Sequence, residues 1–305
     1  MEKFDINILG CGSATPNPRH YTSSQVVDIR GKLFMIDCGE GTQIQMRHQR
    51  MAFARLNHIL ISHLHGDHCF GLLGIISSFG LLGRTAPLYV HAPSELWTIL
   101  KPELDFYCRE LEFEVVFQGF DPNVVHTIYE DRSLTIDTIP LRHRIPCAGF
   151  LLREKPVADH LDRQMADFYG VPTWDFARIK AGGDFTMPDG TIIPHSRLTK
   201  PAGPVRSYAY CCDTAWNPGM VEQINGVNLL YHDCTYSSEH SDRAELHYHS
   251  TAAQAARIAS QANVGMLMLG HFSARYYDEE ILKNEAGAIF PNTILAKEGL
   301  HVPVV

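Results

Sequence analysis

The most constraining feature of this sequence is a loop that holds four metal-binding side chains within six residues. His63, His65, Asp67 and His68 follow directly after the apolar run of residues 59–61. Neutral imidazole and carboxylate groups are ligands that suit zinc, and so compact a loop can aim alternate side chains at two neighbouring ions. The alternative is a polar loop that is rich in histidine by chance, but this spacing is much more specific than a pair of histidines. We therefore expect a fold in which a strand ends at a metal site.

Three further candidates for metal ligands each come just after a short apolar run: His143, Asp213 and His271. Ligands of α/β proteins bind beyond the carboxyl ends of the strands, so strand ends that are far apart in the sequence can meet at one edge of a sheet. Taken alone, His143 or His271 would more often be an ordinary histidine of the core or of a loop. Together with the histidine loop they complete a set of ligands, which predicts a single metal centre.

The seven candidates suffice for two ions that share one carboxylate: His63, His65 and His143 for one ion, Asp67, His68 and His271 for the other, and Asp213 for both. Each ion then keeps a position open for water, which is typical of catalytic rather than structural zinc. Two ions roughly 3.5–4 Å apart can activate a water near neutral pH and stabilise a phosphoryl group, so the pattern predicts hydrolysis rather than redox chemistry. Manganese suits the same ligands, and the sequence leaves the choice of metal open.

Length and composition narrow the class of protein. The 305 residues, of which 45% are hydrophobic and 20% charged, are enough for one large α/β domain. No apolar stretch reaches the roughly 18 residues that a membrane helix needs, and the eight cysteines show no Cys-x-x-Cys spacing, so we expect a cytoplasmic protein with reduced thiols. The net charge of −8 argues against a broad basic surface for nucleic acid and leaves only a local basic patch for such a role.

The order of apolar runs indicates an α/β fold. Runs bounded by glycine, proline and asparagine recur through residues 5–160 in the pattern strand, turn, strand, and the alternation resumes at residues 207–210. A helix is expected at residues 251–262, where Thr251 and Gln254 form a capping-box pattern ahead of alanine-rich sequence. We predict one domain over residues 1–305.

Residues 154–206 interrupt this pattern. They contain six prolines and the turn signals Gly182-Gly183 and Asp189-Gly190, and their periodicity is weak. We therefore predict an arm that is inserted within the domain. Trp174 in this segment could stack on a nucleobase or pack the arm, and packing is the more common role of a lone aromatic side chain.

The candidate ligands and the sequence around them resemble the metallo-β-lactamase superfamily and, within it, the ribonuclease Z family of tRNA 3′-processing endonucleases. The resemblance extends over nearly the whole chain. The stretches that support it are residues 9–16, 37–43, 140–143, 212–214, 249–251 and 271–276. The histidine loop alone indicates only the superfamily. His-Ser-Thr at residues 249–251, ahead of the alanine-rich helix, and His-Phe-Ser-Ala-Arg-Tyr at residues 271–276 narrow the resemblance to ribonuclease Z.

This resemblance implies a four-layer αβ/βα sandwich in which residues 154–206 form a flexible exosite arm for tRNA. It also implies a homodimer that binds two Zn2+ per subunit, with Mn2+ as the alternative. The implied activity is that of a zinc-dependent endoribonuclease that removes the 3′ trailer of precursor tRNA. The products would be a tRNA with a 3′-hydroxyl and a trailer with a 5′-phosphate.

The resemblance also implies two catalytic residues. In the family, the aspartate that matches Asp67 binds zinc and accepts a proton from the attacking water, and the histidine of His-Ser-Thr, here His249, protonates the leaving 3′ oxygen. The plainer interpretation of His249 is a residue at the start of a helix that points into solvent. Asp233 stands where the family has a glutamate, and it could orient His249 as a relay or be a simple acid at a strand end.

Three basic residues are candidates for RNA contact by the same resemblance: Arg178 and Lys180 in the arm, and Arg275 in the last motif. Residues 151–206 contain eight Lys/Arg and seven Asp/Glu, a net charge of +1, so this segment attracts phosphate only weakly. The lysine of the family's Pro-x-Lys-x-Arg-Asn motif is missing from residues 16–20.

Two other functions are compatible with the same residues. A small-molecule phosphodiesterase would use the same two ions, but a small substrate does not need an inserted arm. A catalytically inactive, zinc-stabilised RNA-binding protein would be expected to have lost some ligands, whereas all seven are present.

Overall fold

The computed structural model describes residues 2–305, and these form two compact units. The larger unit, here called the body, consists of Glu2–Glu130, Thr135–Arg153 and Arg206–Val305. The smaller unit, here called the arm, consists of Glu154–Val205 together with Asp131–Leu134. Arg206, which the sequence places at the end of the arm, lies with the body, where its guanidinium donates to two backbone carbonyl oxygens.

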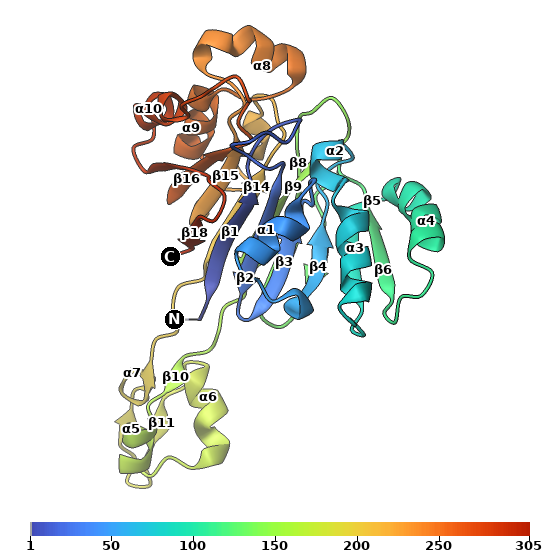
Figure 1. The fold of residues 1–305 in the computed structure, drawn as a ribbon. Helices are drawn as coiled ribbons and strands as arrows, with labels where there is room; N and C mark the ends of the chain where they lie inside the picture. Colours follow the sequence, from blue (N-terminus) through green and yellow to red (C-terminus); the bar gives the residue numbers. More distant parts are fainter. Residues whose placement is uncertain (1) are drawn as a thin grey trace. The chain divides into compact units, whose positions relative to one another are not determined.

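The body is built on two mixed sheets of seven strands each (Figure 1). The strands of the first sheet, in spatial order, are β18 (His301–Pro303), β1 (Phe4–Gly10), β2 (Ser24–Ile29), β3 (Lys32–Ile36), β4 (Leu56–Leu60), β5 (Leu88–Pro93) and β6 (Val115–Phe120). Those of the second are β17 (Thr293–Leu295), β16 (Met266–Gly270), β15 (Leu229–Asp233), β14 (Ser207–Cys211), β9 (Ala148–Glu154), β8 (Leu134–Pro140) and β7 (Thr127–Glu130).

Helices cover the outer face of each sheet, which confirms the predicted four-layer αβ/βα sandwich. On the first sheet, α1, α3 and α4 lie together, and buried residues of α3 and α4 share a hydrophobic cluster with β3, β4 and β5. On the second, α9 packs on β15 and β16, and α10 packs on α9 and β17. The helices of the body are α1 (Thr42–His48), η1 (Phe53–Arg55), α2 (Gly66–Cys69), α3 (Leu72–Leu81), α4 (Leu96–Tyr107), η3 (Pro218–Met220), η4 (Ser238–His240), α8 (Ser241–His247), α9 (Ala252–Gln261) and α10 (Glu280–Gly287).

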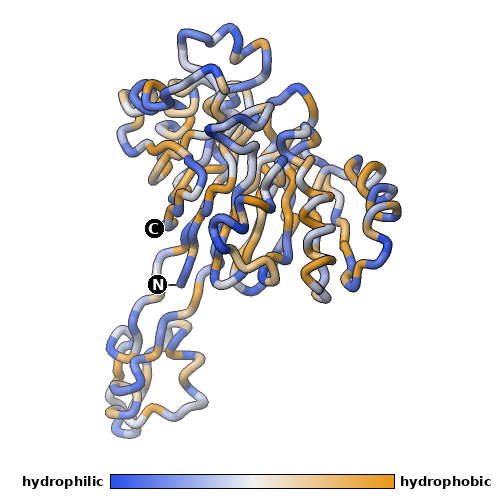
Figure 2. Tube along the Cα trace, in the orientation of Figure 1, coloured by the Kyte–Doolittle hydropathy of each residue, from blue (hydrophilic) through white to orange (hydrophobic). Residues whose placement is uncertain are grey.

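The middle of the second sheet is buried on both of its faces. Strands β14 and β15 are buried at all five of their positions, and β14, β15 and β16 run parallel to one another. Strands covered on both faces are continuous hydrophobic runs rather than alternating ones, which is why this part of the sequence lacks a polar face. Figure 2 shows hydrophobic residues concentrated along the strands of the body. Parallel strands also end at one edge, so the residues after them are brought together.

The main predicted elements of the body are present. The apolar runs before residue 100 lie in β1, β3, β4 and β5, although β4 ends at Leu60, one residue earlier than the run suggests. Helix α9 begins after Thr251, whose hydroxyl accepts from the backbone N–H of Gln254 at 3.2 Å. The side chain of Gln254 accepts in return from the backbone N–H of Thr251 at 2.9 Å, which completes the predicted capping box.

The arm has a hydrophobic core of its own, which the weak periodicity of its sequence did not predict. Its buried apolar residues come from several short elements: Ala166, Val171, Ile179, Phe185, Ile193 and Leu198. The elements are β10 (His160–Leu161), α5 (Arg163–Phe168), η2 (Thr173–Asp175), α6 (Phe176–Lys180), β11 (Phe185–Thr186), β12 (Ile192–Ile193), α7 (His195–Leu198) and β13 (Thr199–Lys200). Elements of two to six residues are too short to show a period, although together they bury a core. The flexibility of the arm stays a prediction.

Trp174 does not pack the arm. Trp174 is 78% exposed on η2, while its neighbour Asp175 is 3% exposed. The expectation that this lone aromatic residue fills the core was wrong because the core is completed by aliphatic residues and Phe185.

The helices of residues 2–305 are all too short or too polar to cross a lipid bilayer.

Candidate metal centre

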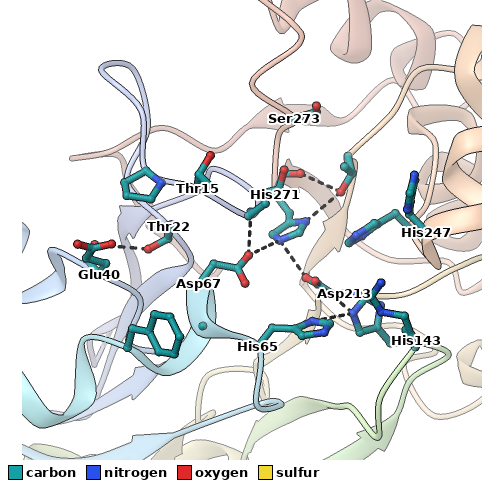
Figure 3. A pocket seen from close by; sticks show the side chains of 18 of the residues that line it. Thr15, Thr22, Glu40, His65, Asp67, His143, Asp213, His247, His271 and Ser273 are labelled. Carbon is teal, nitrogen blue, oxygen red and sulfur yellow. Dashed lines mark hydrogen bonds and ion pairs between the residues drawn. The ribbon is translucent and has the colours of Figure 1, made fainter.

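The candidate ligands follow strands of both sheets. His63, His65, Asp67 and His68 come from the loop and short helix α2 after β4, whereas Asp213 and His271 follow β14 and β16. The register of the parallel strands places Tyr210, Tyr231 and Met268 side by side, so β14, β15 and β16 end close to one another. His143 follows β8 of the same sheet. The structure thus brings all seven predicted ligands to one place in the body. Figure 3 shows five of them: His65, Asp67, His143, Asp213 and His271.

Four of these residues form the first group. His65 Nδ1 lies 3.0 Å from His63 Nε2 and 3.1 Å from His143 Nε2. The Oδ2 atom of Asp213 lies 3.7 Å from both of these Nε2 atoms. Three ring nitrogens and a carboxylate oxygen therefore converge on one point, as the ligands of a metal ion do.

The second group uses the other oxygen of the same carboxylate. Asp213 Oδ1 lies 3.3 Å from His68 Nε2 and 3.1 Å from His271 Nε2. Asp67 Oδ2 lies 3.6 Å and 3.5 Å from these two nitrogens. Because Asp213 presents one oxygen to each group, it is placed to bridge two ions.

The described residues fit a pair of divalent ions. The Nε2 atoms of His68 and His271 are buried and make no hydrogen bond within the part of the chain that the structure describes. A buried polar atom left in this way is costly, and a metal ion would satisfy both. The clusters of histidine and aspartate are those of a binuclear metallo-β-lactamase centre.

Electrostatics agree with metal binding. Burial lowers the pKa of His63, His65 and His143, so these rings are neutral and their lone pairs are free for a cation. Burial also opposes a charge on His68, but the carboxylates of Asp213 and Asp37 outweigh it and raise the pKa of this ring. A divalent ion bound here would supply these carboxylates with the positive charge that the ring proton otherwise supplies.

Asp37, which the sequence analysis gave no role, orients two of the ligands. Its carboxylate is fully buried and accepts from His68 Nδ1 at 2.7 Å and from the Tyr210 hydroxyl at 2.7 Å. It also accepts from the backbone N–H of Ser62 at 2.8 Å and from the Ser62 hydroxyl at 2.9 Å. That hydroxyl accepts in turn from His63 Nδ1 at 2.9 Å. Both rings therefore carry their proton on Nδ1 and turn Nε2 toward the centre.

The signal for Asp37 was present in the sequence. It directly follows the apolar run that forms β3, just as Asp213 follows β14, so position at a strand end could have marked it. Its φ of 57° and the φ of 62° at His271 lie in the left-handed region, which costs a non-glycine residue about 1–3 kcal/mol. Two such residues at one centre are typical of a functional site.

Asp233 lies at a strand end of the second sheet, as Asp37 does in the first. Its Oδ2 accepts from His249 Nδ1 at 2.7 Å, and its Oδ1 accepts from the Thr235 hydroxyl at 2.8 Å. The same hydroxyl accepts from His271 Nδ1 at 2.9 Å. The shorter aspartate thus reaches His249, whose side chain is only 14% exposed, and the interpretation of His249 as a residue pointing into solvent was wrong. Burial opposes a charge on His249, but Asp233 outweighs it and raises the pKa to about 9.

An open cleft of about 580 Å³ lies over the centre. Asp67, His249 and His271 line it together with residues that the sequence analysis did not single out, among them Arg144 and His247. Arg144 is exposed and directly follows the predicted ligand His143 in the sequence. This adjacency is the sequence feature that could have marked Arg144 as a residue of the site.

The three predicted RNA contacts stay predictions. Arg275 lies over the ring of Tyr236, 5.6 Å from its centroid, and Tyr236 lines the cleft. In the arm, Lys180 is exposed, but both Nε and NH2 of Arg178 donate to the carboxylate of Asp175 at 2.6 Å, so this guanidinium is already paired.

Comparison with known proteins identifies the family. The chain is 58% identical to a ribonuclease Z of Bacteroides fragilis (strain YCH46) over 302 residues, which cover 99% of both chains. It is 57% identical to a ribonuclease Z of Phocaeicola vulgatus over 304 residues, covering 100% of this chain and 98% of the relative. The chain belongs to the ribonuclease Z family.

Other similarities agree with membership of the ribonuclease Z family. The crystal structure of human tRNase Z, short form, superposes with a TM-score of 0.73 at 23% identity and covers 99% of both chains, which supports the fold. Residues 4–165 also share the sequence pattern of a family described as anti-Pycsar protein Apyc1. That pattern ends before Asp213, His249 and His271, whereas the ribonucleases Z match the chain over its full length.

The structure predicts that Asp37 controls metal affinity in this ribonuclease Z. Asp37→Asn removes the charge that orients His63 and His68, so we expect metal affinity to fall about 10–100-fold. Competition with a chromophoric chelator measures this affinity. The matched control is Asp28→Asn, which changes a buried carboxylate paired with Lys3 at 2.9 Å in the first sheet, and it should bind metal as the wild type does. Equal affinities of wild type and Asp37→Asn would contradict the assignment.

Proposed function

We propose that this ribonuclease Z is a zinc-dependent endoribonuclease that removes the 3′ trailer of precursor tRNA. The cleavage would leave a 3′-hydroxyl on the tRNA and a 5′-phosphate on the trailer. The observation that carries the proposal is the carboxylate of Asp213, with one oxygen toward each of two histidine groups, in a chain that matches ribonucleases Z over its full length.

We assign Zn2+ to both sites, since imidazole nitrogen and carboxylate oxygen are its usual ligands in hydrolases, with Mn2+ as the alternative. The ions would be held by His63, His65, His143 and Asp213 on one side and by Asp67, His68, His271 and Asp213 on the other. When bound, two such ions supply Lewis acidity toward the phosphoryl oxygens and toward a water.

The side chains of this protein account for the proton transfers. Asp67 lines the cleft, and its Oδ2 accepts from the backbone N–H of Ala14 at 2.8 Å, which orients the carboxylate as a proton acceptor for the attacking water. The pKa of Asp67 is low, because His271 and His68 outweigh the effect of burial, so the carboxylate is ionised at neutral pH. His249 holds the proton that the leaving 3′ oxygen needs, and Asp233 keeps it charged and oriented.

The alternatives have less support. A small-molecule phosphodiesterase would need the same centre, but it would not need an arm with its own core and an exposed Trp174. A catalytically inactive RNA-binding protein would not need two orienting carboxylates behind a complete set of ligands. The homodimer remains a prediction from the resemblance to the family, and the cytoplasmic location remains a prediction from the sequence.

The decisive test is cleavage of precursor tRNA by the purified protein, with the cleaved end mapped. We expect one cut at the 3′ end of the tRNA, a 3′-hydroxyl on the tRNA and a 5′-phosphate on the trailer. Asp67→Ala removes the proposed proton acceptor and one ligand, so we expect its cleavage rate to fall by at least about 1,000-fold with the fold retained in circular dichroism. Persistent turnover by this variant would show that the centre is assigned wrongly.

A second prediction concerns the pH dependence of cleavage. His249 must be protonated to act as an acid, so activity should be lost as the pH rises through its pKa, which Asp233 raises to about 9. Two divalent ions beside the ring oppose its proton, so we expect the alkaline limb of the loaded enzyme below pH 9. Asp233→Asn removes the charge that raises this pKa, and the alkaline limb of the kcat/KM profile should move to lower pH. An unmoved limb would exclude His249 as the titrating acid.

A third prediction separates RNA cleavage from cleavage of small diesters. Arg153 and Ser207 are directly paired in β9 and β14, so residues 155–205 can be replaced by a two-residue Asn-Gly turn that closes the hairpin. We expect this deletion to reduce kcat/KM for precursor tRNA strongly while hydrolysis of a small aryl phosphodiester is retained. Equal losses on both substrates would mean that the arm supports the fold and not tRNA binding.

A further inference from the structure

Phe70 is a large apolar side chain that lies open at the cleft. Its side chain is 75% exposed, although Leu72, two residues later, is buried in the hydrophobic cluster of the first sheet. Phe70 lines the same cleft as Asp67 and His249. A phenylalanine in contact with water loses the free energy that its burial would contribute, so an exposed ring at a catalytic cleft points to a ligand that covers it.

The position of the ring is built into the ligand loop. A Cβ atom at Gly66 would lie 2.3–2.7 Å from three ring atoms of Phe70, closer than any side chain allows. Gly66 is the first residue of helix α2 and stands between the predicted ligands His65 and Asp67, and the ring of Phe70 lies close against its α-carbon. The ring therefore rests against the loop that holds the predicted metal ligands and turns its free surface to the cleft.

Phe70 lies close to Asp67, the proposed proton acceptor for the attacking water. Its backbone N–H donates to the carbonyl oxygen of Gly66 at 2.9 Å, which places it one helical turn beyond Asp67. The proposed acid His249 stacks on His271 with ring centroids 5.2 Å apart, and His271 Nε2 lies 3.5 Å from Asp67 Oδ2, so His271 contacts both residues. The leaving 3′ oxygen must lie at the acid, so the tRNA nucleotide lies on the side of His249. In an in-line displacement the attacking water lies opposite the leaving oxygen, on the Asp67 side. The trailer nucleotide is attached to the phosphorus through its O5′, away from the tRNA nucleotide, which leaves the wall beside Asp67 and Phe70 to the trailer.

We propose that Phe70 is a stacking platform for the nucleobase of the first trailer nucleotide. The proposal rests on the proposed RNA substrate and adds a contact on the trailer side of the scissile bond. A stack of this kind uses the π-face that every base has, so it positions the phosphodiester without selecting a trailer sequence. Tyr236, which lines the same cleft and lies under Arg275, is a second aromatic surface there.

The test compares variants of Phe70 on precursor tRNAs with and without the base of the first trailer nucleotide. Phe70→Ala should lower kcat/KM about tenfold for precursor tRNA, within the range of one lost base stack. It should have no effect on a precursor whose first trailer nucleotide is abasic. Phe70→Trp should keep the wild-type value, and Phe70→Leu should be intermediate. Phe106→Ala is the matched control, since Phe106 is 64% exposed on α4 and does not line the cleft, and it should match the wild type.

Hydrolysis of methyl 4-nitrophenyl phosphate distinguishes lost stacking from damage to the metal centre. The only ring of this diester is its leaving group, so nothing in the place of the trailer nucleotide can stack on Phe70. Phe70→Ala should hydrolyse it as the wild type does. An equal loss on this diester or on the abasic precursor would overturn the proposal, because Phe70 would then act on the metal loop. A loss that disappears only when the last tRNA base is abasic would also overturn it. Wild-type protein that hydrolyses the diester and leaves precursor tRNA intact would overturn the proposed RNA substrate itself.

Discussion

The centre depends on one carboxylate that is buried between two groups of histidines. Asp213 is 2% exposed and turns a different oxygen to each group. A carboxylate removed from water is strongly destabilising unless positive charge surrounds it, and the neutral rings of His63, His65 and His143 do not carry that charge. Two divalent ions do, so the arrangement is stable when metal is bound. The convergence of strand ends from both sheets serves to place nitrogen ligands around this one group.

Each sheet supplies one further buried carboxylate that holds the ligands in orientation. Asp37 follows β3 of the first sheet and holds His68 directly and His63 through Ser62. Asp233 ends β15 of the second sheet and holds His249 directly and His271 through Thr235. Hydrogen bonds of this kind fix which ring nitrogen carries the proton, so the other is free for metal. The proposed acid is thereby tied to the same carboxylate as a metal ligand, which couples the geometry of binding to that of proton transfer.

The acidic balance of the chain restricts how it can hold RNA. With a net charge of −8 it cannot rely on a broad basic surface, and Arg178 in the arm is already paired with Asp175. Near the centre, the groups that could contact RNA include Arg144, Tyr236 under Arg275, and the ring of Phe70 beside Gly66. Stacking on aromatic rings adds affinity that does not depend on net charge, so it suits such a protein.

The candidate metal ligands could be predicted without a structure because each is marked by the sequence directly around it. A histidine loop after an apolar run, and single polar residues after three other runs, follow from the chemistry of strand ends, and the capping box at Thr251 is equally local. The role of Asp37, the reach of Asp233 to His249, the core of the arm and the exposure of Trp174 depend on contacts between segments that are far apart in the chain. Residue type and spacing therefore predicted which side chains form the His/Asp clusters. Only the packing of the two sheets decided which carboxylate holds which ring, because hydrogen bonds of 2.7–2.9 Å need side chains placed in three dimensions.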